Sequence, residues 1–194
     1  MFLLAKAFIR FRAFSVLCLV ACAFISNAQA IRFYKESIHF TLTKKHFHIN
    51  GFYSFSFSQK MQSNLILYPF PIDISLIDTI VVKNITTNKT IPYSTQNRTI
   101  TFQLLNEKYD SLLIEISYRQ KIESSPVLYI LTTTSFWNEP LEEARYLLEI
   151  QDNLKVDSIS YEPDKIWKKN KKKFYYIERK NFMPERDFIV WFKY

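Results

Sequence analysis

Histidine can begin a metal site or act as a base, and the chain contains three: His39, His46 and His48. His46 and His48 are two residues apart, so a strand would place both imidazoles on one face. A zinc site needs at least a third protein ligand, and no carboxylate is adjacent in this segment. We therefore expect these histidines to face solvent.

Three carboxylates are clustered at Glu139, Glu142 and Glu143. To act in a hydrolase, such a group would need a base beside it or a second carboxylate across a cleft. Pro140 lies among them, and negative charge is favourable at a helix start. We expect them to begin a helix. The sequence thus predicts no catalytic residue, metal ligand or cofactor site, and a protein that is not an enzyme.

The strongest charged feature, called the basic tip below, consists of Trp167, Lys168, Lys169, Lys171, Lys172 and Lys173. Its position before the apolar run Phe174–Ile177 fits the end of a hairpin. One interpretation is a contact for an anionic glycan, lipid head groups or a phosphate polymer. The other, which we favour, is a solvated turn that protects a sheet edge.

Tryptophan can form a sugar-stacking platform, and the chain has Trp137, Trp167 and Trp191. Core packing is the commoner role, and it is the one that we expect here.

Glycine is nearly absent, since Gly51 is the only one. This excludes a glycine-rich phosphate loop, a dinucleotide-binding fingerprint and a G-x-S-x-G nucleophile elbow. With 48% hydrophobic residues, the chain is also too apolar to be disordered.

Residues 1–30 have the pattern of an export signal, in which basic residues precede the short apolar run 13–25. Ala28-Gln29-Ala30 is a small-x-small site, so we expect cleavage after Ala30 and a secreted or periplasmic domain over residues 31–194. An alternative is a lipobox ending at Cys22, which would anchor a lipoprotein to a membrane. After cleavage at Ala30 the domain would hold no cysteine.

The net charge is +8 for the chain, and loss of Lys6, Arg10 and Arg12 with the leader would lower it to +5. Such a mild positive charge does not predict binding to nucleic acid.

Alternating apolar and polar residues predict strands throughout residues 31–194, for example at Ile38–Leu42, Ile100–Leu104 and Leu112–Tyr118. About ten mostly antiparallel strands predict an all-β fold, a single β-sandwich or a partly closed barrel. For residues 139–150 we expect a short turn of helix that leads into a strand.

Asn50-Gly51 suggests a tight hairpin turn, but the phase of the pattern opposes it. In one continuous strand, Phe47, Ile49, Tyr53, Phe55 and Phe57 share a face, whereas a turn would mix the faces. We therefore predict a continuous strand, with a possible bulge at Gly51.

Several segments resemble a family of bacterial secreted or envelope β-sandwich ectodomains: Ile49–Phe55, Tyr68–Pro71, Tyr129–Trp137, Pro140–Ala144 and Asn181–Val190. The general plan is also similar to the β-rich N-terminal domain of secreted aminopeptidase-like proteins, whose catalytic H-E-x-x-H helix lies in a later domain. The resemblance implies a fold and a compartment, without an activity.

Together these observations predict a non-catalytic exported protein that acts as a protein-interaction or structural module of the cell envelope, with another envelope or secreted protein as partner. The alternative is a glycan- or anionic-polymer-binding module that uses the basic tip. A third hypothesis is an accessory domain of a metallopeptidase system, for which metal binding by His46 and His48 would be the test.

Overall fold

The computed structural model describes residues 31–58, 63–151 and 154–193, which form fourteen strands and two short 3₁₀ helices. The predicted leader, with Cys22 and Ala30, lies outside the described residues, so its cleavage or lipidation stays a prediction. None of the helices in the described part is long and apolar enough to span a membrane.

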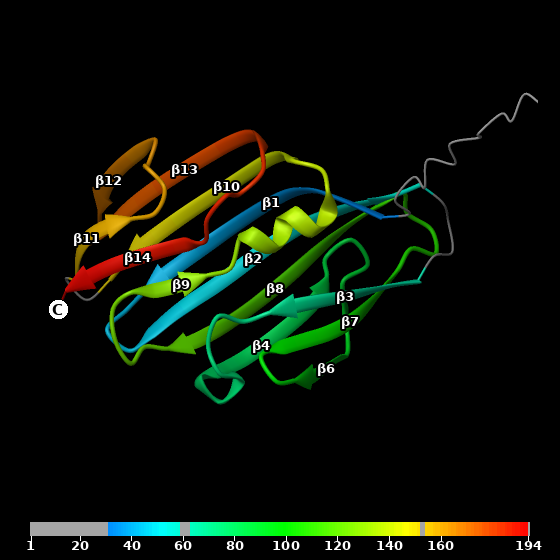
Figure 1. Ribbon diagram of the computed structural model, residues 1–194, viewed down its shortest axis with the longest axis horizontal. Coiled ribbons are helices and arrows are strands. Elements are labelled where there is room, and N and C mark those ends of the chain that lie inside the picture. The colour runs from blue at the N-terminus through cyan, green and yellow to red at the C-terminus, as the bar shows by residue number, and fades with distance from the viewer. Residues whose placement is uncertain (1–30, 59–62, 152–153, 194) are drawn as a thin grey trace, which may run out of the picture.

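The largest sheet has eight strands (Figure 1), in the order β12 (Lys165–Lys169), β13 (Lys172–Phe182), β10 (Leu141–Ile150), β1 (Ile31–Leu42), β2 (His46–Phe57), β8 (Ser111–Lys121), β4 (Ile77–Asn84) and β5 (Lys89–Thr90). β1 and β10 pair in parallel, and the other neighbours are antiparallel. The edge strands β12 and β5 do not pair with each other, so the described strands do not close into a barrel.

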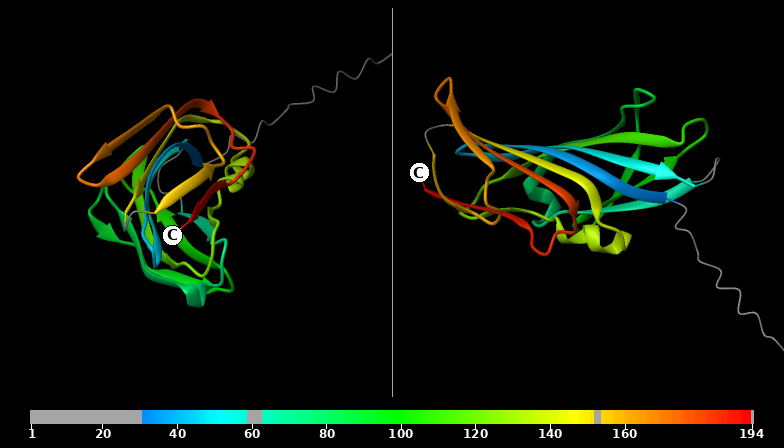
Figure 2. Two further views of the ribbon diagram at one scale, coloured as in Figure 1. Left: turned by 90° about the vertical axis from the view of Figure 1, so that its left-hand side faces the viewer. Right: turned by 90° about the horizontal axis from the view of Figure 1, so that it is seen from above.

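Two three-stranded sheets form a second layer, β11 (Lys155–Ile159), β14 (Phe188–Lys193) and β9 (Val127–Tyr129) in one, and β3 (Ser63–Pro69), β7 (Thr99–Leu105) and β6 (Tyr93–Gln96) in the other. Both contact the same face of the large sheet. Phe40 of β1 stacks on Phe188 of β14 with ring centroids 4.3 Å apart, and Tyr53 of β2 reaches Tyr68 of β3. Figure 2 shows this second layer against one side of the long strands.

The core lies between the two layers and follows from the period-two pattern of the long strands. Phe40, Phe47 and Tyr146 are almost completely buried on the inner face of the large sheet. The outer face instead carries ion pairs, such as those of Arg145 with Glu143 and Glu178. The alternation thus decides which face of each strand is covered.

The predicted all-β, mostly antiparallel fold is confirmed, with more strands than the ten expected. The predicted helical turn at residues 139–150 is wrong, because β10 begins directly at Leu141 and its alternating side chains pack against the core. A 3₁₀ helix, η2 (Thr132–Trp137), lies instead just before it, and a shorter one, η1 (Ile74–Leu76), precedes β4.

β2 is one continuous strand, as the phase of the pattern predicts, and Gly51 lies in its middle. The possible bulge at Gly51 is not found, since Gly51 pairs regularly with Ile38 and Ile116. The glycine has another role. A β-carbon at Gly51 would overlap the hydroxyl oxygen of Tyr53 and lie 2.6 Å from its ring, so the missing side chain leaves room for this tyrosine.

We therefore expect Gly51→Ala to lower the free energy of unfolding by about 1–3 kcal/mol, the usual cost of overpacking a core. The reason is that the buried Tyr53 ring would have to move. In a Tyr53→Leu background the same substitution should cost much less, because the clashing hydroxyl and ring are gone and glycine itself weakens a strand. Urea unfolding of the four proteins in this cycle measures both effects. Equal costs in the two backgrounds would contradict the close approach.

Candidate ligand-binding cleft

A β-bulge in β1 brings a carboxyl group to the inner face of the large sheet. Phe33 pairs with Phe55 and Lys35 with Ser54, which leaves Tyr34 as the extra residue. Because the bulge shifts the phase by one residue, Phe33 and Glu36 both point inward. Glu36 is only 4% exposed, although its side chain is acidic.

A cleft of about 620 Å³ opens above Glu36, in the space between the two small sheets. Its floor comes from β1, β2 and β8 of the large sheet, one wall from β3 and β7, and the other from β9 and η2. In Figure 1, the coiled ribbon of η2 and the arrow of β3 both lie in front of the long strands. The lining is mostly apolar, and the aromatic side chains in it are Phe33, Tyr53, Phe55, Tyr68, Phe102, Tyr129, Phe136 and Trp137.

Three tyrosine hydroxyls meet among the lining residues. The hydroxyl oxygen of Tyr53 lies 2.7 Å from that of Tyr129 and 3.0 Å from that of Tyr68, and Tyr68 donates to Tyr129 over 3.2 Å. Burial raises the pKa of all three phenols. The cluster therefore consists of neutral hydroxyl groups that link β2, β3 and β9.

Glu36 accepts a hydrogen bond from the hydroxyl of Tyr146 on β10. Burial raises the pKa of Glu36 to about 7, and the hydrogen bond from Tyr146 opposes this shift. The carboxyl group is thus neutral in mildly acidic solution and ionises near neutral pH, because an uncompensated charge is costly in an apolar site.

The rim of the cleft exposes large apolar side chains. Phe136 of η2 is 80% exposed, and Leu65 and Leu67 of β3 are 61% and 66% exposed. All three also line the cleft. Exposed apolar groups around a concave site are typical of a surface that meets a ligand or a partner.

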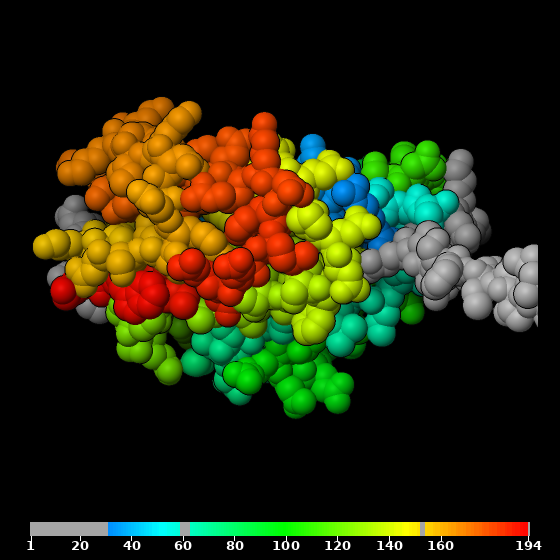
Figure 3. Space-filling view, turned by 45° about the horizontal axis from the view of Figure 1, so that its top comes forward, coloured from blue at the N-terminus to red at the C-terminus, as the bar shows by residue number. Residues whose placement is uncertain are grey.

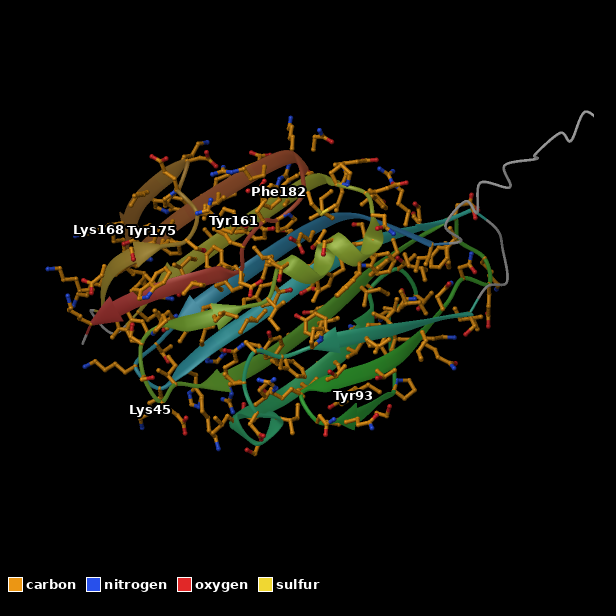
Figure 4. All side chains as sticks on the ribbon, viewed as in Figure 1. Lys45, Tyr93, Tyr161, Lys168, Tyr175 and Phe182 are labelled. Atoms are coloured by element: carbon orange, nitrogen blue, oxygen red, sulfur yellow. The ribbon has the colours of Figure 1, made fainter. Side chains whose placement is uncertain are left out.

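The basic tip forms a hairpin end, as predicted, and lies at one end of the molecule (Figure 3). Asn170 and Lys171 both have positive φ, at 51° and 62°, which suits a two-residue turn between β12 and β13. Lys172 pairs with Glu149 over 2.7 Å, and the ammonium of Lys173 lies 4.7 Å from the Tyr175 ring centroid. Lys168, labelled in Figure 4, is exposed together with Lys169 and Lys171.

The three tryptophans lie on three different elements rather than in one platform. Trp137 of η2 packs on Phe33 and Phe55, as expected for a core residue. The same expectation is wrong for Trp167 and Trp191, which are 39% and 38% exposed. Trp167 nevertheless stacks on Phe174 with the two rings almost parallel, so its indole covers part of the sheet edge.

The remaining candidate residues have structural partners. Glu139 and Glu142 bind Arg32 at 2.5 and 2.8 Å, and Glu143 binds Arg145, so these carboxylates pair with basic side chains instead of starting a helix. His46 and His48 lie side by side on the outer face of β2, with ring centroids 5.9 Å apart. Among the described residues, no group of three potential metal ligands occurs.

Apart from Trp137, which was considered as a sugar-stacking residue, the residues that build the cleft were not identified as a site from the sequence. Glu36 carried one usable signal, since it lies two residues before Ile38, in phase with the apolar face of that strand. None of the basic-tip residues lines the cleft. The tyrosine cluster offered no local signal, because its members come from three separate strands.

No family model matches the sequence, and no curated protein matches it. Solved structures do share its fold. A nutrient-binding protein candidate from Legionella pneumophila matches with a TM-score of 0.62 and 15% identity, over 84% of this chain and 67% of that one. The M1 zinc metallopeptidase of Deinococcus radiodurans matches with a TM-score of 0.51 and 12% identity, over 84% and 42%.

Yeast LTA4 hydrolase also matches, with a TM-score of 0.52 and 8% identity, over 87% of this chain and 30% of that one. The chain therefore spans less than half the length of these two enzymes. The structural neighbours include the β-rich N-terminal domain of M1 aminopeptidases, in agreement with the resemblance seen in the sequence. At these identities the likeness concerns the fold alone.

The raised pKa of Glu36 makes the stability of the fold depend on pH. Between the usual glutamate pKa of 4.5 and the folded value of about 7, the folded state binds more protons than the unfolded state. The contribution of Glu36 to the free energy of unfolding should therefore fall by about 3 kcal/mol as pH rises through this window, at about 1.4 kcal/mol per unit.

Urea unfolding at pH 4.5 to 8 measures this effect, with Glu36→Gln as the variant whose residue 36 does not titrate. As pH rises, the free energy of unfolding of wild type should fall relative to that of Glu36→Gln. Glu115→Gln, on the outward face of β8, is the matched control and should follow wild type. If the free energies of unfolding of wild type and Glu36→Gln changed with pH in parallel, the raised pKa of Glu36 would be contradicted.

Proposed function

We propose that this protein is an exported, non-catalytic β-sandwich of the cell envelope, and that it binds a small apolar molecule in the cleft. The observation that carries the proposal is the cleft itself, which combines apolar walls with a few convergent polar groups. Its volume of about 620 Å³ lies within the usual range of ligand sites, roughly 300–1,000 Å³.

The position of the cleft also supports this proposal. The eight-stranded sheet supplies the floor, while the walls come from β3 of one small sheet and from η2. The exposed rim formed by Leu65, Leu67 and Phe136 gives an apolar molecule a surface to meet first. Nutrient binding is attributed to the Legionella neighbour, and this attribution is compatible with a binding role for the shared fold. The protein partner expected from the sequence stays a prediction.

Filling the cleft with a larger side chain should weaken binding of an apolar ligand. Thr133 of η2 lines the cleft, so Thr133→Trp should weaken binding of the neutral fluorescent probe N-phenyl-1-naphthylamine at least tenfold. The matched control is Thr95→Trp on the exposed strand β6, which should bind the probe as wild type does. Fluorescence titration gives the affinities, and circular dichroism verifies the fold. Wild-type protein that fails to bind the probe, or equal binding by both variants, would contradict the proposal.

The basic tip supports a second candidate function, binding of an anionic glycan or other anionic polymer. Its lysines Lys168, Lys169 and Lys171 are exposed around one turn. Trp167 and Ile166, 39% and 55% exposed, lie beside them. A positive turn next to an exposed indole suits a sulfated or phosphorylated polysaccharide, through charge attraction and stacking.

Replacing Lys168, Lys169 and Lys171 together by glutamine should weaken binding to dextran sulfate severalfold and flatten its dependence on salt, because attraction between exposed charges is screened by ions. The matched control replaces Lys83, Lys89 and Lys121, which removes the same net charge elsewhere. Affinity measured across a salt series distinguishes the two triple variants. An equal loss in both would mean that only the net charge matters.

A further inference from the structure

We propose that the cleft selects apolar molecules that carry an ammonium group, and that this ammonium binds Glu36. The inference rests on the proposed function of the cleft and adds the chemistry of the ligand. It follows from the charge of the lining, from the hydrogen-bonding capacity of the floor and from the aromatic walls.

Glu36 is the one residue with an acidic or basic side chain among the described residues that line the cleft. The other lining side chains are apolar, or carry hydroxyl or amide groups. A buried carboxylate gains most from a positive partner, because water does not screen their attraction. Charge complementarity inside the cleft therefore favours a cation and opposes a carboxylate or phosphate.

The tyrosine cluster also favours an ammonium ligand. Each tyrosine hydroxyl has one hydrogen to donate, and the contacts among Tyr53, Tyr68 and Tyr129 form a triangle. When each hydroxyl donates to the next, all three hydrogens are used and a lone pair remains on the oxygens of Tyr53 and Tyr129, while the Tyr118 hydroxyl interacts with that of Tyr68. The cluster and Glu36 then offer acceptors to a ligand, and an ammonium group carries only donors.

The aromatic side chains of the cleft suit the same ligand. Phe33 lies with its ring centroid 6.0 Å from that of Tyr53 and 5.8 Å from that of Trp137, and all three residues line the cleft. The faces of such rings attract cations, and clustered rings are the usual surroundings of bound organic ammonium ions. The remaining apolar lining can bury the hydrocarbon part of the ligand.

The ionisation of Glu36 makes this selectivity dependent on pH. The titratable groups that face Glu36 are the phenols of Tyr146 on β10, Tyr53 on β2, Tyr129 on β9 and Tyr161, which follows β11. The pKa of each of these phenols is raised by burial, so they stay neutral while Glu36 titrates. An ammonium ligand should therefore bind more tightly above the Glu36 pKa of about 7 than at pH 5.5.

Three probes with the same eight-carbon chain test the proposal by calorimetry on the purified protein: octylammonium, 1-octanol and octanoate. At pH 8 we expect octylammonium to bind at least tenfold more tightly than octanol, and octanoate to bind most weakly. At pH 5.5 the advantage of octylammonium over octanol should shrink at least threefold. Octanol corrects for the apolar contribution, because its chain is the same and its head group is neutral.

Glu36→Gln should reduce the affinity for octylammonium to that for octanol at both pH values, while Glu115→Gln should keep the wild-type preference. The pH series on wild type tests the proposal even when Glu36→Gln does not fold. Equal binding of octylammonium and octanol to wild type, or a preference for octanoate, would overturn the ammonium proposal and leave the apolar cleft intact. Absence of binding by all three probes would overturn both.

Discussion

The inner face of the large sheet must be covered along the whole length of β1 and β2, and the rest of the structure depends on this constraint. Both strands have twelve residues and carry apolar side chains at inward positions. No single small sheet covers that length. Two separate sheets do so, one around Phe188 and the other around Phe102. The space between them is closed only in part by η2, and this leaves the cleft.

Glu36 is an exception on this otherwise apolar inner face. An inward position in β1 would normally hold an apolar residue, because burying a carboxyl group costs free energy. The bulge at Tyr34 keeps both Phe33 and Glu36 inward, and the hydroxyl of Tyr146 offsets part of the cost. A polar residue kept at such an expense, at the floor of a cleft and next to a bulge, is typical of a functional site.

Some enzymes contain a domain with this fold, but the shared fold does not imply that this chain has their catalytic activity. The matched part covers less than half of the Deinococcus metallopeptidase and of yeast LTA4 hydrolase. A fold carries many unrelated functions, so the function must be inferred from the residues of the site. Here these residues are one buried carboxyl group, three linked tyrosine hydroxyls and a surrounding set of aromatic rings. They suit recognition of a ligand, which is why the proposals concern binding.

The sequence by itself determined the all-β class, the inward faces of β2, of β8 and of the Ile38–Leu42 part of β1, and the hairpin end formed by the basic tip. Each of these depends on neighbours within one strand or one turn, where period-two alternation and turn-forming residues act locally. At residues 139–150 it suggested a helical turn that does not form, since Pro140 and the following glutamates also suit a helix start.

Only the tertiary structure decided the candidate site. Tyr53, Tyr68 and Tyr129 are far apart in the chain and meet because three strands from both layers converge. Tyr146 reaches Glu36 through the parallel pairing of β1 with β10, which no local pattern specifies. The basic tip was visible in the sequence because like residues are consecutive there. The cleft was not, because its residues are brought together by packing over long separations along the chain.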